Sequence, residues 1–271
     1  MNISVSLVDS HAHLDMQEFN PDRQQVIERA RRSGIHRILC PLDLSSEESL
    51  RIGFELSQKN PDILLAAGIH PHQASQLKTC HLDNLKKLAK ENKILAVGEI
   101  GLDFHYNFSS RDKQLEAFKL QLELATELGL PAIIHSREAE KELLELIPDP
   151  GFSPGGILHC FTESYETARK MIDRGFLISF SGILTYPGAE QIRETARKLP
   201  LDRLLVETDS PYLTPLPEKK KYRRNEPAFI LSTARLLAEL HKITLEELAE
   251  ITGANFSLLL KLKKQTPDVK M

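Results

Sequence analysis

Two histidines separated by one residue follow the first apolar segment of the chain and could hold a metal ion. His11 and His13 come after a run from Ile3 to Val8 that alternates apolar and polar residues and is typical of a β-strand. Residues two apart on a strand point to the same face, so both imidazoles can reach one ion. The alternative is that they are polar residues in a turn at the end of the strand.

The same kinds of side chain recur where later apolar segments end. Six of the ten histidines follow a predicted strand within a few residues. The groups at the strand ends are His11, His13 and Asp15; His70 and His72; Glu99 and Asp103; His135 and Arg137; His159 and Cys160; and Glu207 and Asp209. A single histidine at a strand end is more often a hydrogen-bonded turn residue, but scattered solvated histidines would not gather at these positions.

Imidazole and carboxylate ligands together suit Zn, Mn, Fe or a similar divalent ion. Four histidines and two carboxylates are too many ligands for one tetrahedral site that keeps an open position. They suit two ions that share a bridging ligand. Such ions, roughly 3.5–4 Å apart, clamp the attacking and leaving oxygens of a hydrolysed ester and make hydroxide available near neutral pH.

Eight short apolar segments alternate with amphipathic stretches and must position these groups. The predicted strands are Ser6–Ser10, Arg37–Pro41, Leu64–Gly68, Ala96–Ile100, Ala132–His135, Gly156–His159, Phe176–Phe180 and Leu204–Glu207. The predicted helices are Pro21–Arg32, Glu47–Lys59, Leu82–Glu91, Gln114–Leu128, Glu138–Ile147, Tyr165–Arg174, Gln191–Leu199, Pro227–Leu240 and Leu245–Leu262. This alternation predicts an α/β fold, a single-domain (β/α)8 TIM barrel over residues 1–271, with a doubly wound open sheet as the alternative. The active site of such a barrel lies at the C-terminal ends of its strands.

The composition limits the function classes that remain. The chain has 271 residues, a formal net charge of -3 and 41% hydrophobic residues, so it is not a globally basic nucleic-acid binder and any phosphate affinity must be local. Its three cysteines have no paired spacing and argue against a disulfide framework. We find no signal peptide and no apolar run near the ~20 residues of a membrane span. We therefore expect a cytoplasmic protein with no membrane association and no obligatory protein partner.

Seven motifs occur in order between about Val8 and Phe256, which is nearly the whole chain. They are His11-Ala12-His13-Leu14-Asp15, Gly68-Ile69-His70-Pro71-His72, Gly98-Glu99-Ile100-Gly101-Leu102-Asp103, Ile134-His135-Ser136-Arg137, His159-Cys160-Phe161-Thr162, Glu207-Thr208-Asp209-Ser210-Pro211-Tyr212-Leu213 and Arg224-Asn225-Glu226-Pro227. This set resembles the TatD-type metal-dependent deoxyribonucleases, a family of TIM barrels related to the amidohydrolases. The set is highly specific, although no single motif is.

The resemblance implies a divalent-metal-dependent deoxyribonuclease that hydrolyses DNA phosphodiester bonds from a 3′ end through a two-metal-activated water. It implies one ion held by His11, His13, Glu99 and Asp209, and a second held by Glu99, His135 and His159. The ions would be Mg, Mn or Zn. Glu99 and Asp209 are then the catalytic carboxylates, because Glu99 can give one oxygen to each cation and Asp209 can accept a proton from the attacking water. His70 would touch the substrate phosphate.

Two further residues bear on the substrate. Arg137, two residues past an implied ligand, could clamp a phosphate bidentately, or it could form a structural ion pair. Glu163 stands where the family usually has glycine, and a carboxylate there would repel a phosphate unless it points outward or caps the helix that begins near Ser164. We expect a single strand as the substrate, because a terminal phosphodiester must enter a pocket of convergent ligands.

Two other segments have patterns that could bind nucleic acid. The basic run Lys219–Arg224 follows the last strand and could hold a polyanion, with Tyr222 stacking on a base, or it could be a solvated loop. The segment Leu245–Asn255 resembles a helix-turn-helix with Gly253 at the turn, as in a DNA-binding regulator, but the following Phe256–Leu260 is too apolar to read base edges. We expect this segment to pack its leucines on the barrel instead.

The main alternative function uses the same metal centre on a carboxylic ester or amide, as in aminoacyl-tRNA deacylation. A third possibility is a metal-binding partner protein without catalysis. The complete ligand set argues against that third possibility.

Overall fold

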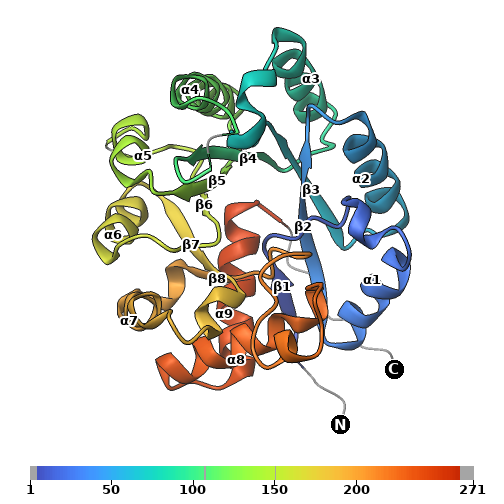
Figure 1. The fold of residues 1–271 in the computed structure, drawn as a ribbon, viewed down its shortest axis with the longest axis vertical. Coiled ribbons are helices and arrows are strands. Elements are labelled where there is room, and N and C mark those ends of the chain that lie inside the picture. Colours follow the sequence, from blue (N-terminus) through green and yellow to red (C-terminus); the bar gives the residue numbers. More distant parts are fainter. Residues whose placement is uncertain (1–4, 107, 150, 263–271) are drawn as a thin grey trace.

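The computed structural model describes residues 5–106, 108–149 and 151–262 and shows parallel strands surrounded by helices (Figure 1). The strands are β1 (Leu7–Asp9), β2 (Ile35–Asp43), β3 (Ile63–Gly68), β4 (Ala96–Asp103), β5 (Ala132–Arg137), β6 (Gly156–Leu158), β7 (Phe176–Phe180) and β8 (Leu204–Val206). The helices are α1 (Arg23–Arg32), α2 (Glu47–Lys59), α3 (Thr79–Lys90), α4 (Arg111–Leu128), α5 (Glu140–Leu146), α6 (Tyr165–Asp173), α7 (Glu190–Lys198), α8 (Ile230–His241) and α9 (Leu245–Leu259). Neighbouring strands follow the chain order from β1 to β8, which confirms the predicted TIM barrel.

The two ends of the sheet meet through backbone contacts that nearly close the barrel. The amide of Ser10 donates to the carbonyl of Val206 at 3.1 Å, and the amide of Asp209 donates to the carbonyl of His11 at 2.9 Å. A parallel bridge also joins Ala12 to Ser210. These contacts hold the ends of β1 and β8 side by side, so the motifs that follow the two strands become neighbours.

The barrel interior is filled from all eight strands. One buried cluster takes a residue from each strand in turn: Val8, Leu39, Ala66, Ala96, Ile133, Ile157, Leu177 and Leu205. Phe256 and Leu260, within and just after α9, pack against this cluster. The side-chain amide of Asn255 donates to the carbonyl of Leu204 at 3.0 Å, so α9 lies against the N-terminal ends of the strands. The opposite end of the barrel is left for the predicted site.

The helix-turn-helix interpretation of Leu245–Asn255 is wrong. Gly253 lies inside the continuous helix α9, and there is no turn at this position. Phe256 and Leu260, which follow it, are core residues that cover the barrel interior, whereas Leu258 faces solvent.

The remaining differences between prediction and structure are small. The strand β7 and the helix α2 have the predicted bounds, whereas β4 and β5 each extend past the predicted end, to Asp103 and Arg137. Ile3, where the first predicted alternating run begins, lies outside the described residues. None of the described helices is long and apolar enough to cross a membrane.

Candidate metal centre

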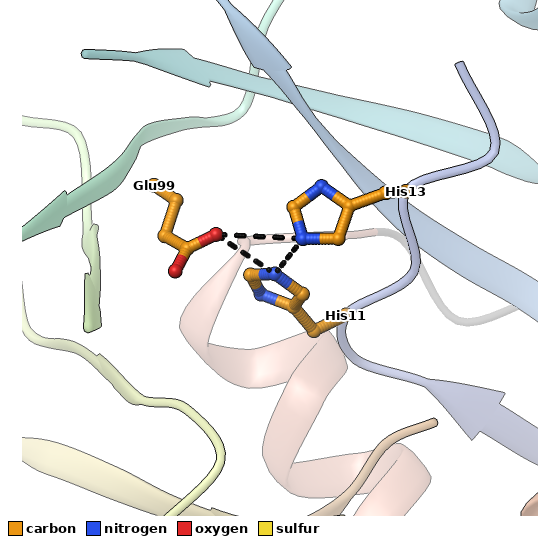
Figure 2. A group of neighbouring side chains, drawn as sticks. All are labelled: His11, His13 and Glu99. Carbon is orange, nitrogen blue, oxygen red and sulfur yellow. Dashed lines mark hydrogen bonds and ion pairs between the residues drawn. The ribbon is translucent and has the colours of Figure 1, made fainter. Parts of the chain in front are cut away.

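All six predicted metal ligands lie at the C-terminal end of the barrel. Glu99 and His135 belong to β4 and β5, and the others follow strands directly. Those that follow β1, β6 and β8 are His11, His13, His159 and Asp209. The imidazoles of His11 and His13 point at Glu99 across the barrel (Figure 2). The strand ends therefore bring together residues nearly 200 positions apart in the sequence.

The two carboxylate oxygens of Glu99 face different histidines. Oε2 lies 3.2 Å from Nε2 of His11 and 3.5 Å from Nε2 of His13 (Figure 2). Oε1 lies 2.8 Å from Nε2 of His159 and 3.1 Å from Nδ1 of His135. The carboxylate thus stands between two groups of imidazoles.

An irregularity in β4 points Glu99 into the barrel. Ala96 already faces the interior cluster, so strict alternation would turn Glu99, three residues later, toward the helices. The pairing of β4 with β5 shifts register between Val97 and Ile100, and Gly98 has a φ of +154°. A side chain at Gly98 would also collide with Ile133. The glycine therefore permits the backbone course that re-aims Glu99.

Asp209 completes the first group. Its Oδ1 lies 3.4 Å from Nε2 of His13 and 3.8 Å from Nε2 of His11. The neighbouring Thr208 donates its hydroxyl and its amide to the buried carboxylate of Asp9, at 2.6 and 2.9 Å. Asp9 thereby fixes the end of β8 against the end of β1, which positions Asp209 beside the two histidines.

Burial lowers the pKa values of His11 and His70, whereas the buried carboxylates outweigh burial and raise the pKa values of His13, His135 and His159. Burial raises the pKa of Glu99, but the charges of His159, His70 and His11 outweigh burial and hold this pKa well below its usual range. Burial lowers the pKa of His13, yet the hydrogen bond to Asp209 and the charge of Glu99 raise it to about 9. A divalent cation can take the place of such protons, since metal binding to histidine releases them.

The donor atoms fit divalent cations. Nε2 of His11 and Nε2 of His13 lie 3.1 Å apart, and both face the same oxygen of Glu99. Ligand atoms of His70, Glu99 and His135 form a second close group, all within 4.8 Å of one another. Imidazole nitrogen with carboxylate oxygen is the donor set of Zn and Mn sites.

His70 shares the second group but is more exposed than His159. Its Nε2 lies 3.2 Å from Oε1 of Glu99, almost the distance at which His135 lies. His70 is 21% exposed at the mouth of the cluster, whereas His159 is 3% exposed. A molecule that approaches the cluster from solvent can therefore reach His70.

Carboxylates behind the cluster hold its histidines. Oε1 of Glu207 lies 3.3 Å from Nδ1 of His159, so this carboxylate can orient the ring. No role for Asp103 or His72 is predicted from the sequence. Asp103 Oδ2 lies 3.2 Å from Nε2 of His135 and 2.9 Å from Nε2 of His72. The only sequence signal for this link was a carboxylate at the end of a predicted strand.

Among the described residues, the guanidinium of Arg137 makes no ion pair and packs on an aromatic ring instead. Its guanidinium carbon lies 4.8 Å from the ring centroid of Tyr106.

Glu163 accepts a hydrogen bond from the hydroxyl of Ser136 at 2.8 Å, and Ser164 itself caps α6. The carboxylate of Glu163 is therefore bound by β5, and it is not the helix cap.

The basic run Lys219–Arg224 is partly engaged in structural contacts. Lys219 lies 4.0 Å from the ring centroid of Tyr186, and Arg224 forms an ion pair with Asp22. The ring of Tyr222 packs against Phe229, with centroids 5.0 Å apart. These contacts tie the loop to the body of the protein.

Comparison with known proteins gives one consistent result. A sequence profile described as TatD related DNase matches residues 8–261. The chain is 38% identical over 257 residues to the uncharacterized metal-dependent hydrolase YabD of Bacillus subtilis, covering 94% of this chain and 99% of that protein. It is 34% identical over 261 residues to the 3′-5′ ssDNA/RNA exonuclease TatD of Salmonella typhimurium, covering 94% and 99%.

A solved structure agrees with these sequence relatives. The crystal structure of YjjV, a TatD homologue from Escherichia coli, superimposes with a TM-score of 0.87 at 28% identity and covers 95% of this chain and 98% of that one. The profile match spans the motifs from which the barrel-end cluster is built. The chain therefore belongs to the TatD family of metal-dependent hydrolases.

Proposed function

We propose that this chain is a two-metal phosphodiesterase that removes nucleotides from the 3′ end of single-stranded DNA. The observation that carries the proposal is the placement of the two oxygens of Glu99, each of which faces its own group of imidazoles. A carboxylate in this position can give one oxygen to each of two cations. The Salmonella relative named as a 3′-5′ exonuclease supports the choice of substrate and polarity.

The proposed ligands divide into two sets. One divalent ion is held by His11, His13, Glu99 and Asp209, and the second by Glu99, His135 and His159. We assign His70, whose Nε2 also lies 3.2 Å from Oε1 of Glu99, to a phosphate oxygen of the substrate and not to either ion. The ions would be Mg, Mn or Zn, since the imidazoles suit Zn and the carboxylates suit Mg or Mn.

The chemistry follows from these positions. Two bound divalent ions would supply a water of lowered pKa and charge stabilisation for the oxygens of the phosphodiester. Asp209 accepts the proton of the attacking water. Burial raises the pKa of Asp209, but the hydrogen bond to His13 and the nearby imidazole charges hold it below its usual range, so the carboxylate is ionised at neutral pH and able to accept. Arg137 binds a phosphate group of the substrate, since its guanidinium has no acidic partner among the described residues.

A substrate panel tests the proposal. Protein loaded with Mg, Mn or Zn is incubated with end-labelled single-stranded DNA, the matching duplex, an RNA of the same sequence and an aminoacyl-tRNA, each with a chelated control. We expect metal-dependent, stepwise shortening of the single strand from its 3′ end. Release of the amino acid without shortening of any nucleic acid would instead assign the centre to carboxylic esters.

A further inference from the structure

Two large aromatic rings are exposed side by side after β4. Tyr106 is 42% exposed and Phe108 is 69% exposed. Their rings stack, with centroids 5.6 Å apart and an angle of 22° between the planes. Exposed apolar surface of this kind is costly to leave in water, and a contiguous patch usually marks a binding site.

Hydrogen bonds hold Tyr106 and Ser109, the residue that follows Phe108, in place. The buried hydroxyl of Ser109 donates to the carbonyl of His72 at 2.9 Å and accepts from the amide of Ser75 at 3.1 Å. The amide of Tyr106 donates to Oδ1 of Asp103 at 2.9 Å. Tyr106 and Ser109 are therefore anchored to the barrel end, which reduces the ordering that binding would require at these two residues.

The pair borders the candidate metal centre. Both rings contact His72, with centroid distances of 5.7 Å from Tyr106 and 4.9 Å from Phe108. The ring of His72 lies 4.3 Å from the ring of His70, at the mouth of the cluster. Asp103 joins the two parts, because it accepts from the backbone of Tyr106 through Oδ1 and contacts His135 through Oδ2. A substrate group on the rings would lie beside the reacting atoms.

A positive charge accompanies the rings. The guanidinium of Arg137 packs on Tyr106 and has no acidic partner in the parts of the chain that the structure describes. The matching ligand therefore combines a flat apolar ring with a nearby anion. A nucleotide has both features, and every base offers a π-face for stacking, whatever the sequence.

We propose that the exposed ring of Phe108, supported by Tyr106 stacked against it, forms a stacking platform for the base of a nucleoside that flanks the scissile phosphodiester of a single-stranded nucleic acid. Arg137 binds the phosphate attached to that nucleoside. Bases inside a duplex are stacked on both faces, so an unpaired base has the free faces that these rings require. The platform rests on the proposed nuclease function and extends it by explaining how a single strand is selected.

The test compares substrates with and without a base. One end-labelled single-stranded oligonucleotide is normal, and two others carry an abasic tetrahydrofuran residue at the terminal or the penultimate 3′ position. We expect Phe108→Ala to raise KM for the normal oligonucleotide by about 5- to 100-fold, the range for loss of one base–aromatic stack, with little change in kcat. One of the abasic substrates should show the raised KM with the wild-type protein and no further rise with the variant.

Two additional variants separate stacking from structural damage. Phe108→Trp should restore the low KM, because it restores an aromatic face. Leu258→Ala removes an equally exposed apolar side chain, 79% exposed on α9 at the other end of the barrel, and should match the wild type. An equal effect of Phe108→Ala on normal and abasic substrates, or no effect on either, would overturn the platform while the nuclease proposal stands. A wild-type protein that shortens no oligonucleotide with Mg, Mn or Zn would overturn both.

Discussion

Glu207 lies directly behind His159, with Oε1 of the carboxylate 3.3 Å from Nδ1 of the imidazole. The other nitrogen of that ring, Nε2, lies 2.8 Å from Oε1 of Glu99. The same oxygen of Glu207 accepts the amide of Cys160 at 2.7 Å, so the carboxylate is fixed by the backbone. Glu207 therefore orients His159 and holds a proton on Nδ1, which leaves Nε2 free to face a cation.

Replacing Glu207 should weaken metal binding without removing a ligand of either proposed set. Glu207→Gln keeps the size of the side chain but loses the charge behind His159, so we expect metal affinity to fall about 10- to 100-fold. Competition with a chromophoric chelator measures this change. Glu166→Gln, at a carboxylate 71% exposed on α6, is the control. Equal affinities in the wild type and Glu207→Gln would contradict the orienting role.

The sequence was sufficient to predict the barrel and the location of its site. Each ligand follows a short apolar segment, and a parallel barrel brings all such positions to one end. For His135 and His159, alternation also predicts the correct face, because Ile133 and Ile157 two residues earlier lie in the interior cluster. The positions of the ligands after their strands and the faces of His135 and His159 depend on the local alternation of apolar and polar residues, which can be read from a single sequence.

The direction of Glu99 and the role of Asp103 could not be predicted in this way. Alternation from Ala96 would turn Glu99 outward, and only the register shift beyond Val97 reverses this. Asp103 contacts His72 and His135, each more than 30 positions away, and such pairings depend on the packed loops. The resemblance of Leu245–Asn255 to a helix-turn-helix has no counterpart in the structure, because packing on the barrel keeps α9 continuous through Gly253.

Metal binding should stabilise the fold, because the ligands come together only in the native barrel. An ion at about 100 times its Kd adds roughly 2.7 kcal/mol to the free energy of unfolding, and this should raise Tm measurably. Calorimetry of chelated protein with and without added Mn tests this. Asp209→Asn should lose much of the rise, whereas Asp202→Asn, at a carboxylate 69% exposed, should keep it. A full rise in Asp209→Asn would remove this residue from the ligand set.

An ion pair outside the site should make stability depend on acid pH. Hydrogen bonds from Arg224, and secondarily from Arg29, lower the pKa of Asp22 to about 2 from 3.8. Because the pKa is lower in the folded state, the contribution is complete above the unfolded value and is lost as the pH falls through the folded one. Asp22 is 30% exposed, so we expect Asp22→Asn to cost about 1 kcal/mol at pH 7 after allowing for solvent screening.

Urea denaturation at several pH values measures this contribution. The difference in free energy of unfolding between the wild type and Asp22→Asn should shrink as the pH falls below 3.8 toward about 2. Glu28→Gln, which removes an exposed ion pair with Arg32, should show little difference at any pH. A pH-independent difference for Asp22→Asn would mean that its effect comes from packing and not from charge.

The central claim is that Glu99 joins two ions into one catalytic centre, and its most direct test is digestion of end-labelled single-stranded DNA by the Glu99→Ala protein in excess Mn. Wild-type protein with Mn and with a chelator is measured beside it. If each oxygen of Glu99 serves one ion, the variant will leave the DNA unshortened, as the chelated wild type does, while the metal-loaded wild type shortens it stepwise. Shortening by Glu99→Ala at the full wild-type rate would contradict the bridging role of Glu99.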